Sequence, residues 1–293
     1  MSKTNVFCFG FGQVAKSFIK KLDFEKIQIN LTTTSRGKTQ KKTIGKINYN
    51  SLQFTKDKYD PALLNALKKS NYILVSIPPT EKTDIVIKNL KEIINNDNNK
   101  LKWITYLSAT SVYGDHKGKW VNEASEKRPT SNNGKNRLSA ENNWIKLAKK
   151  KKLPIQIFRL SGIYSNKRNI LTRLKSGEAN IIKKKKHYFS RIHVEDIANI
   201  LFKSMSKFKS AEIYNISDDK PAPSKDVTLY GVKLLNIEKP KTVEIKEIES
   251  KMLKDFYKDS KKVNNKKMKE FFNYKLKYPT YVEGLNHIFN NII

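Results

Sequence analysis

The stretch Val6-Phe7-Cys8-Phe9-Gly10-Phe11-Gly12-Gln13-Val14-Ala15 decides the fold. Its first four residues form an apolar run typical of a buried strand, and a helix-period segment follows from Gln13 to Leu22. In the G-x-G-x-x-A turn between them, Gly10 allows a tight turn, Gly12 lets the backbone approach a pyrophosphate, and Ala15 permits close helix packing. Because a helix N-terminus attracts anions, we predict a dinucleotide there, with a merely tight turn as the alternative. The residues predicted to bind it are Gly10, Gly12, Gln13 and Val14.

The end of the second expected strand, Ile27 to Thr33, favours NADP over NAD. An NAD site would place Asp or Glu here to accept the ribose hydroxyls. The run from Thr32 to Lys38 has no carboxylate. Instead it offers one hydroxyl and two cations to a 2′-phosphate, from Ser35, Arg36 and Lys38. The alternative is a solvated basic turn in a lysine-rich chain.

A pair of prolines, Pro78-Pro79, follows the expected strand from Tyr72 to Ile77. Neither proline can continue a central ladder, so the chain should turn across the cofactor at this point. Ser76 and Pro78 are therefore predicted neighbours of the dinucleotide, and a plain strand terminator is the alternative.

Short apolar runs alternate with helix-period segments through the first 200 residues, which is typical of βαβ units and a parallel sheet covered on both faces. The remaining expected strands are Trp103 to Leu107 and Ile155 to Leu160, and the remaining expected helices are Pro61 to Lys69, Thr83 to Asn95 and Asn136 to Lys149. We predict an α/β fold with a Rossmann-type doubly wound parallel sheet and a small C-terminal α/β substrate-binding cap. The NAD(P)-binding part should span residues 1–165 and the substrate-binding part 166–293, with 191–217 returning to the sheet.

Composition narrows the class of protein. The 293 residues are 38% hydrophobic, which is too apolar for a disordered chain, and no apolar run has the length of a membrane span. The single cysteine excludes a disulfide framework and a thiolate metal cluster, and no spacing suggests another metal site. We therefore expect a cytoplasmic monomer or homodimer with a small-molecule substrate, no metal and no membrane contact.

The charge of the chain is strongly positive, with 59 Lys+Arg against 27 Asp+Glu, a net +32. Clustered cations would indicate nucleic acid, but only seven of the basic residues are arginine and the lysines are scattered. The two lysine runs, Lys149 to Lys152 and Lys183 to Lys186, lack the interleaved aromatic residues of a stacking platform. A lysine-rich composition explains the charge more simply, and weak nucleic-acid association remains as an alternative.

Several segments carry a family resemblance: Tyr106 to Asp115, Gly134 to Glu141, Arg159 to Tyr164, Ser190 to Ala198 and Tyr214 to Asp219. In this order they resemble the extended short-chain dehydrogenase/reductase group, the NAD-dependent epimerase/dehydratase proteins, and within it an atypical branch. The resemblance covers nearly the whole chain. It implies a cofactor on the sheet and a substrate held mainly by the C-terminal part.

The catalytic groups implied by the resemblance are replaced in this chain. The family uses a Ser or Thr, and a Tyr and a Lys in Tyr-x-x-x-Lys spacing, so that the ammonium lowers the pKa of the phenol. The motifs place these positions at Ala109, Asn133 and Arg137. Neither a methyl nor an amide exchanges protons, and a guanidinium stays protonated. The acid/base function is lost, whereas Arg137 could still hold a ribose or a phosphate.

Candidate substitutes lie just after expected strands, where open α/β sheets bind ligands. Tyr113 and Tyr164 are candidate proton donors or, alternatively, pocket walls, and His116 and His193 titrate in the right range. The remaining predicted substrate-binding residues are Ser108, Thr110, Tyr113, Arg168 and Arg191. The leading hypothesis is an NADP-linked oxidoreductase or epimerase acting on a sugar-like or nucleotide-linked substrate. The alternative is a non-catalytic NADP-binding sensor or scaffold.

Overall fold

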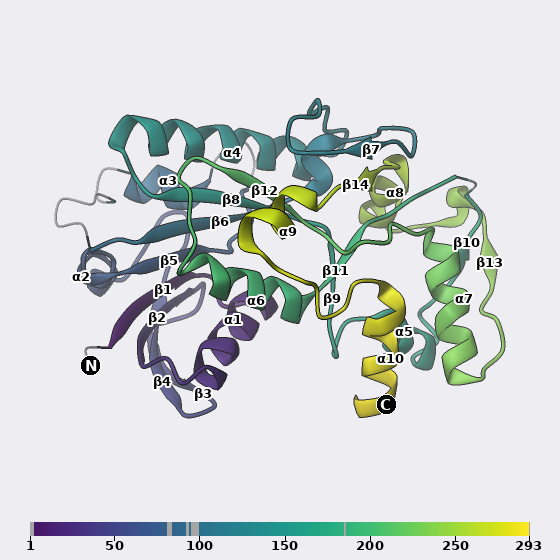
Figure 1. Cartoon of the computed structure of the whole chain (residues 1–293), viewed down its shortest axis with the longest axis horizontal. Coiled ribbons are helices and arrows are strands. Elements are labelled where there is room, and N and C mark those ends of the chain that lie inside the picture. The colour runs from purple at the N-terminus through teal and green to yellow at the C-terminus, as the bar shows by residue number, and fades with distance from the viewer. Residues whose placement is uncertain (1–2, 81–83, 92–93, 95–99, 185, 293) are drawn as a thin grey trace. The chain divides into compact units, whose positions relative to one another are not determined.

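The computed structural model describes residues 3–80, 84–91, 94, 100–184 and 186–292 (Figure 1). The strands are β1 (Thr4–Phe9), β2 (Ile29–Ser35), β3 (Gln40–Ile44), β4 (Ile47–Gln53), β5 (Tyr72–Val75), β6 (Trp103–Ala109), β7 (Trp120–Val121), β8 (Ile155–Leu160), β9 (Gly162–Tyr164), β10 (Ile181–Ile182), β11 (Arg191–His193), β12 (Ile213–Ile216), β13 (Thr242–Val243) and β14 (Lys262–Val263). The α-helices are α1 (Gln13–Phe24), α2 (Ala62–Lys69), α3 (Ile85–Leu90), α4 (Asn132–Lys151), α5 (Ile170–Lys175), α6 (Val194–Ser204), α7 (Ser224–Leu235), α8 (Lys251–Lys258), α9 (Lys266–Phe272) and α10 (Tyr281–Ile292). Two 3₁₀ turns are η1 (Thr110–Tyr113) and η2 (Ile245–Glu247).

An eight-stranded sheet has the order β12-β8-β6-β5-β1-β2-β4-β3. The pairings of β1 with β2 and β5, of β2 with β4, and of β5 with β6 are parallel, and the edge strand β3 pairs with β4 in antiparallel orientation. All six residues of β8 and the last four of β1 are buried, as expected of strands covered on both faces. The predicted α/β class with a largely parallel sheet is confirmed.

Helices cover both faces of this sheet (Figure 1). On one face, α2, α3 and α4 bury Leu63, Leu90 and Trp144 against Phe7 and Phe9 of β1. Helix α1 lies on the other face. Its buried residues recur at helical spacing between Val14 and Leu22, so one side of the helix is buried. The predicted helix from Thr83 to Asn95 is α3 over its described part, and residues 83, 92–93 and 95 lie outside the described residues.

The hairpin β3–β4 was not among the expected elements. It turns at Gly45, which has φ +57°, and β3 forms the edge of the sheet. Four of the five residues of β3 are exposed, so the strand Gln-Lys-Lys-Thr-Ile carries no apolar alternation to reveal it. Lysines suit such an edge because they discourage pairing with another chain.

The chain divides into two compact units. Unit 1 comprises residues 1–108, 136–159 and 197–213, and unit 2 comprises residues 109–135, 160–196 and 214–293. Unit 2 contains three two-stranded parallel sheets, β9–β11, β10–β13 and β7–β14. The predicted division of the chain at residue 165 stays a prediction.

No helix in the described ranges has the length and apolar character needed to cross a membrane.

Candidate functional site

The turn between β1 and α1 is tight, as the sequence predicted, and Gly10 adopts a positive φ there. Gly10 has φ +78°, and a Cβ atom there would lie 3.0 Å from the Ser76 Oγ atom. The Gly10 N–H donates to Thr34 Oγ1 at 2.9 Å, and the Ser76 hydroxyl donates to the Phe9 carbonyl at 2.9 Å. Ser76 therefore fastens β1 to the end of β5, and a side chain at Gly10 would be both strained and crowded.

In front of α1 lies open space. Gly12, the N-cap residue, has φ −80° and ψ −169°, an extended conformation that any residue adopts. A Cβ atom at Gly12 would meet no atom within 4 Å, and no side chain caps the helix. Gln13 and Val14 form its first turn. The start of this twelve-residue helix can therefore receive an anion against its backbone.

The residues expected to choose the nucleotide follow β2. Ser35 closes the strand, and its buried Oγ atom has no hydrogen-bond partner within the described ranges. Arg36 and Lys38 are exposed on the next turn. Pro78, the other expected neighbour of the cofactor, is exposed after β5. A buried hydroxyl followed in sequence by two exposed cations can bind a phosphate, because each of the three groups supplies N–H or O–H donors.

Arg137, which the motifs were predicted to place at the position of the usual catalytic lysine, lies on α4. Its Nη1 atom donates to the Leu107 carbonyl at 3.0 Å, which ties the guanidinium to the end of β6. Its Nε atom and the Ser108 Oγ atom are buried, and neither has a partner among the residues described. Buried donors of this kind are rare unless a water or ligand satisfies them, so unit 1 retains polar groups for a ligand at this end of the sheet.

The other two positions at which we predicted a replaced catalytic group, Ala109 and Asn133, lie in unit 2. Ala109 is half-buried and Asn133 is exposed. At Gly134 a Cβ atom would approach the Ser111 carbonyl oxygen to 2.7 Å, so the close packing here requires glycine. The close approach seats α4 on η1, where Thr110 is buried.

Both tyrosines considered as catalytic substitutes are buried. The Tyr113 hydroxyl donates to Asn215 Oδ1 at 2.7 Å. Tyr164 packs against α10 so closely that a Cβ atom at Gly284 would lie 2.0 Å from its hydroxyl. Burial raises the pKa of the Tyr164 phenol above its ordinary range. Deprotonation of Tyr164 is therefore disfavoured in this environment.

A pocket of about 800 Å³ lies within unit 2. Its wall includes β9, α5 and residues of α7, α8 and α10. Three of the seven arginines of the chain line it, namely Arg168, Arg173 and Arg191, together with Lys167. Glu178 is the one acidic residue in this lining. The scarce arginines thus converge on one pocket, which can hold an anion by bidentate hydrogen bonds.

Arg191 of β11 is held by neutral acceptors. Its Nη1 atom donates to the carbonyls of Phe189 and Ala222 at 2.9 and 3.0 Å, and its guanidinium lies 5.0 Å from the centre of the Phe189 ring. Desolvation lowers the pKa of Arg191, and the negative charge of Asp218 opposes that shift. Burial raises the pKa of the Asp218 carboxyl in turn. Arg191 is therefore a pocket-lining guanidinium whose hydrogen-bond acceptors are neutral and whose nearby carboxyl group is that of Asp218.

Arg173 was not among the residues predicted from the sequence. It follows Arg168 on the far side of the N-cap of α5, where the Asn169 side chain accepts from the Thr172 N–H at 3.0 Å. The scarcity of arginine had already singled out Arg168 and Arg191, and the same signal applies to Arg173. Nothing in the local pattern indicated that all three would reach one pocket.

His193, one of the two histidines considered as proton carriers, lies on a strand. It ends β11, which pairs with β9 in a separate two-stranded sheet, while β12 forms the edge of the main sheet. The ring makes T-shaped contacts with Tyr164 and Tyr278, whose ring centroids lie 5.0 and 4.2 Å away. Burial lowers the pKa of His193 to about 4, so the ring is neutral at pH 7. The other candidate, His116, lies in the loop before β7. Its ring contacts the carbonyl groups of Tyr113 and Glu126.

Glu195 and Asp196 lie in the first turn of α6, and their side chains also bind the segment before α10. Asp196 accepts the Tyr274 hydroxyl at 2.6 Å and the backbone N–H groups of Lys277 and Tyr278. Glu195 binds the Lys277 ammonium at 2.8 Å. The pair therefore fastens the segment before α10 to unit 2.

No cluster of three or more potential metal ligands occurs in the part of the chain that the structure describes.

Comparison with known proteins places this geometry in context. No family model and no curated protein matches the chain. A functionally unknown conserved protein from Silicibacter pomeroyi has a similar structure, with a TM-score of 0.80, 30% identity and 98% of each chain covered. The dTDP-glucose 4,6-dehydratase of Bacillus anthracis, solved with NAD, has a TM-score of 0.78 at 18% identity over 98% of this chain and 96% of that one. The UDP-N-acetylglucosamine 4-epimerase of Bacillus cereus has a TM-score of 0.76 at 16% identity over 99% and 96%.

Proposed function

Because the chain belongs to one family with the functionally unknown Silicibacter pomeroyi protein and has the extended short-chain dehydrogenase/reductase fold, we propose that it binds a nicotinamide dinucleotide at the β1–α1 turn. One observation carries the proposal: Gly12 leaves open space before an uncapped twelve-residue helix. A pyrophosphate placed there would meet backbone N–H groups and the positive end of the helix dipole.

The proposed cofactor is NADP rather than NAD. No carboxylate follows β2, and Ser35, Arg36 and Lys38 offer a hydroxyl and two cations to a 2′-phosphate. Arg137 would hold a ribose hydroxyl through its partnerless Nε atom. Hydride transfer is the chemistry that such a nucleotide supplies when it is bound.

The proposed substrate is a small anionic molecule, sugar-like or nucleotide-linked, in the pocket of unit 2. Three arginines line this pocket, and Arg191 is bonded to neutral carbonyls rather than to a carboxylate. The dehydratase and epimerase with this fold are named for nucleotide-linked sugars. Arg168 and Arg173 would join Arg191 in binding the anionic group, because guanidinium groups bind phosphates and carboxylates bidentately.

A thermal unfolding titration tests the cofactor. NADPH should raise the unfolding temperature more than NADH, since a ligand at about 100 times its Kd adds about 2.7 kcal/mol of stability. Gly12→Ala should leave the unliganded protein as stable as before, because the backbone at Gly12 is ordinary and the space is open, but should abolish both responses. Arg36→Ala should reduce only the NADPH response, and Lys46→Ala, which removes an exposed cation of the same unit, should change neither. Absence of any response in the unaltered protein contradicts the proposal.

The second candidate is a non-catalytic sensor or scaffold that binds the same nucleotide. The observation favouring it is that Ala109 and Asn133 cannot exchange protons, while the Tyr113 hydroxyl is already bonded to Asn215. A screen of carbonyl compounds and sugar nucleotides for hydride exchange separates the two. Turnover that is lost in Tyr113→Phe or Tyr164→Phe supports the enzyme, and tight nucleotide binding without turnover supports the sensor.

A further inference from the structure

Trp120 of β7 is an exposed ring on the surface of unit 2, with 55% of its surface accessible. The Lys262 ammonium lies 6.0 Å from the centre of this ring and 4.2 Å from the centre of the Tyr188 ring. Three segments that are distant in sequence therefore place one cation over two aromatic rings. This aromatic–lysine face belongs to neither the predicted cofactor turn nor the pocket.

The backbone under this face is firmly held. Trp120 and Lys262 are register partners in the β7–β14 pair. Gly118 has φ +74°, and a Cβ atom there would lie 3.1 Å from the Tyr188 ring, so the glycine makes room for the ring. The Ser260 hydroxyl accepts the Tyr188 N–H at 3.0 Å and donates to the Lys186 carbonyl at 3.0 Å. The rings thus sit on a fixed surface.

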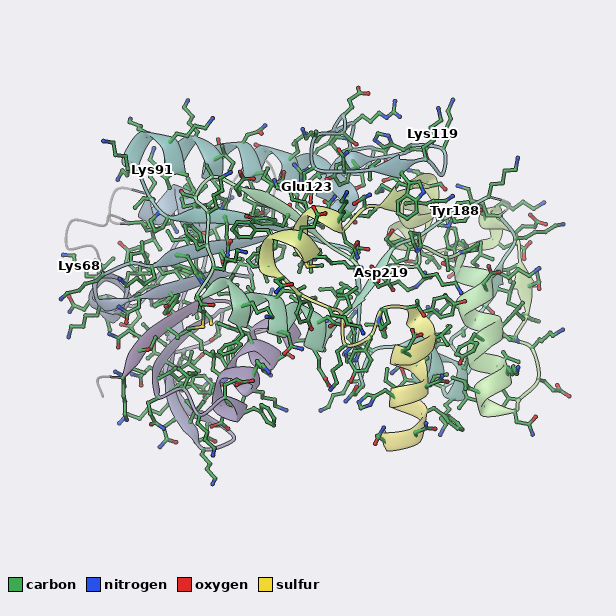
Figure 2. The ribbon with its side chains drawn as sticks, in the orientation of Figure 1. Lys68, Lys91, Lys119, Glu123, Tyr188 and Asp219 are labelled. Carbon is green, nitrogen blue, oxygen red and sulfur yellow. The ribbon has the colours of Figure 1, made fainter. Side chains whose placement is uncertain are left out.

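The charge of the same surface is positive. Lys117 and Lys119 precede Trp120, and Lys186, the last residue of a lysine run, lies two residues before Tyr188; all three lysines are exposed. Figure 2 labels Lys119 and Tyr188 of this surface. The carboxylates of these segments are engaged with the protein itself: Asp115 accepts the Ser260 and Lys117 N–H groups, and Asp259 accepts the Thr130 hydroxyl.

We propose that the aromatic–lysine face binds single-stranded nucleic acid. An unpaired base would stack on the exposed Trp120 ring, and the neighbouring phosphates would meet Lys119 and Lys262, whose ammonium the half-buried Tyr188 ring holds beside Trp120. Stacking on aromatic rings together with lysine point charges gives binding that tolerates any sequence.

An acidic protein fits this surface less well. Protein interfaces are built around a buried core of several apolar side chains. Among the described residues of unit 2, only Trp120 and Ile237 are large hydrophobic residues that are exposed. A duplex fits less well than a single strand because its bases are already stacked on one another.

Intrinsic fluorescence makes the test specific to this face. The chain has three tryptophans, and Trp103 and Trp144 are fully buried, so an added ligand can quench only Trp120 by contact. The full-length protein is titrated with an oligo(dT) strand of about 20 nucleotides, longer than one typical binding site. We expect quenching, and affinity that falls steeply between about 50 and 200 mM salt.

Variants then locate the site. Trp120→Ala should weaken binding about fivefold or more, which is the lower end of what one base stack contributes, and Trp120→Phe should recover most of the affinity. Lys262→Gln should lower the salt dependence. Phe24→Ala, which removes a ring 79% exposed in unit 1, is the matched control and should have no effect.

Three results overturn the proposal: no binding of oligo(dT), equal affinity of Trp120→Ala and the unaltered protein, or tighter binding of polyglutamate or of the duplex than of the single strand. The NADPH response is measured on the same variants. It should be unchanged, so failure of this proposal and failure of the proposed cofactor site are separate outcomes.

Discussion

Arg159 of β8 and Arg191 of β11 are both withdrawn from bulk water, and their partners differ. In unit 1, Arg159 is 1% exposed and donates from Nε and Nη2 to both oxygens of the buried Glu141 carboxylate, at 2.7 to 3.1 Å. In unit 2, Arg191 donates to carbonyls and to the Ser224 hydroxyl and lines a pocket. A guanidinium neutralised by a carboxylate is part of the scaffold, whereas one bonded to neutral oxygens keeps its charge for a ligand.

The largest effect is expected where the buried ion pair is broken. Arg159→Gln should lower the free energy of unfolding by about 3–5 kcal/mol, because it leaves the Glu141 carboxylate buried without its cation. Urea unfolding at pH 7 measures this loss. The double variant Arg159→Met with Glu141→Leu removes both charges and should recover most of the stability. If Arg159→Gln lowers the free energy of unfolding by less than about 1 kcal/mol, the Arg159–Glu141 pair contributes no more than a surface salt bridge. Arg159 would then not differ from Arg191 in its structural role.

A smaller effect is expected from His193, two residues after Arg191 on the same strand. The folded protein has a His193 pKa of about 4 against an ordinary 6.5, so between these values the unfolded chain binds the extra proton. Stability from the neutral ring is therefore complete above pH 6.5 and is lost as the pH falls, by about 3 kcal/mol at pH 4.

Urea unfolding from pH 7 to pH 4 measures this loss, and His193→Phe isolates it. Phenylalanine keeps the ring contacts with Tyr164 and Tyr278 but cannot titrate, so the stability of the variant should fall less over this pH range. Parallel profiles for the variant and the unaltered protein would contradict the assignment.

The smallest loss of stability is expected for Arg191→Gln. It removes hydrogen bonds to neutral acceptors, each contributing about 1 kcal/mol, and Asp218 can take up a proton because burial already raises its pKa. We expect a loss of about 1–2 kcal/mol. Pyrophosphate should raise the unfolding temperature of Gly12→Ala, in which the proposed cofactor turn is blocked, and not that of the double variant Gly12→Ala with Arg191→Gln. Protection of both by pyrophosphate would place the anion elsewhere than at Arg191.

Regular segments of unit 1 were largely predictable. The expected strand from Ile155 to Leu160 is β8, because a central strand covered on both faces must be apolar throughout. The helices expected from Gln13 and from Pro61 correspond to α1 and α2. The β3–β4 hairpin escaped prediction because an exposed edge strand needs no apolar alternation.

The residues of the candidate sites also differ in how well the sequence predicted them. The glycines of the β1–α1 turn act within one short segment, so their spacing alone predicted the backbone that Gly10 adopts. Arg173 reaches the pocket only because α5 packs beside β9 and α7, and Tyr188 meets Lys262 only because two distant segments share one surface. Such meetings depend on long-range packing, which leaves no local periodicity.

By itself, the sequence determined the α/β class and the tight turn at Gly10 and Gly12, and it predicted the replacement of the usual catalytic groups at Ala109, Asn133 and Arg137. These properties reside in local pattern and residue chemistry. Only the tertiary structure decided which arginine is neutralised and which lines a pocket, that His193 is a buried neutral ring, and that Trp120, Tyr188 and Lys262 form one face. The physical reason is that charge, pKa and stacking depend on which neighbours the fold brings within a few ångströms, and those neighbours come from segments far apart in the chain.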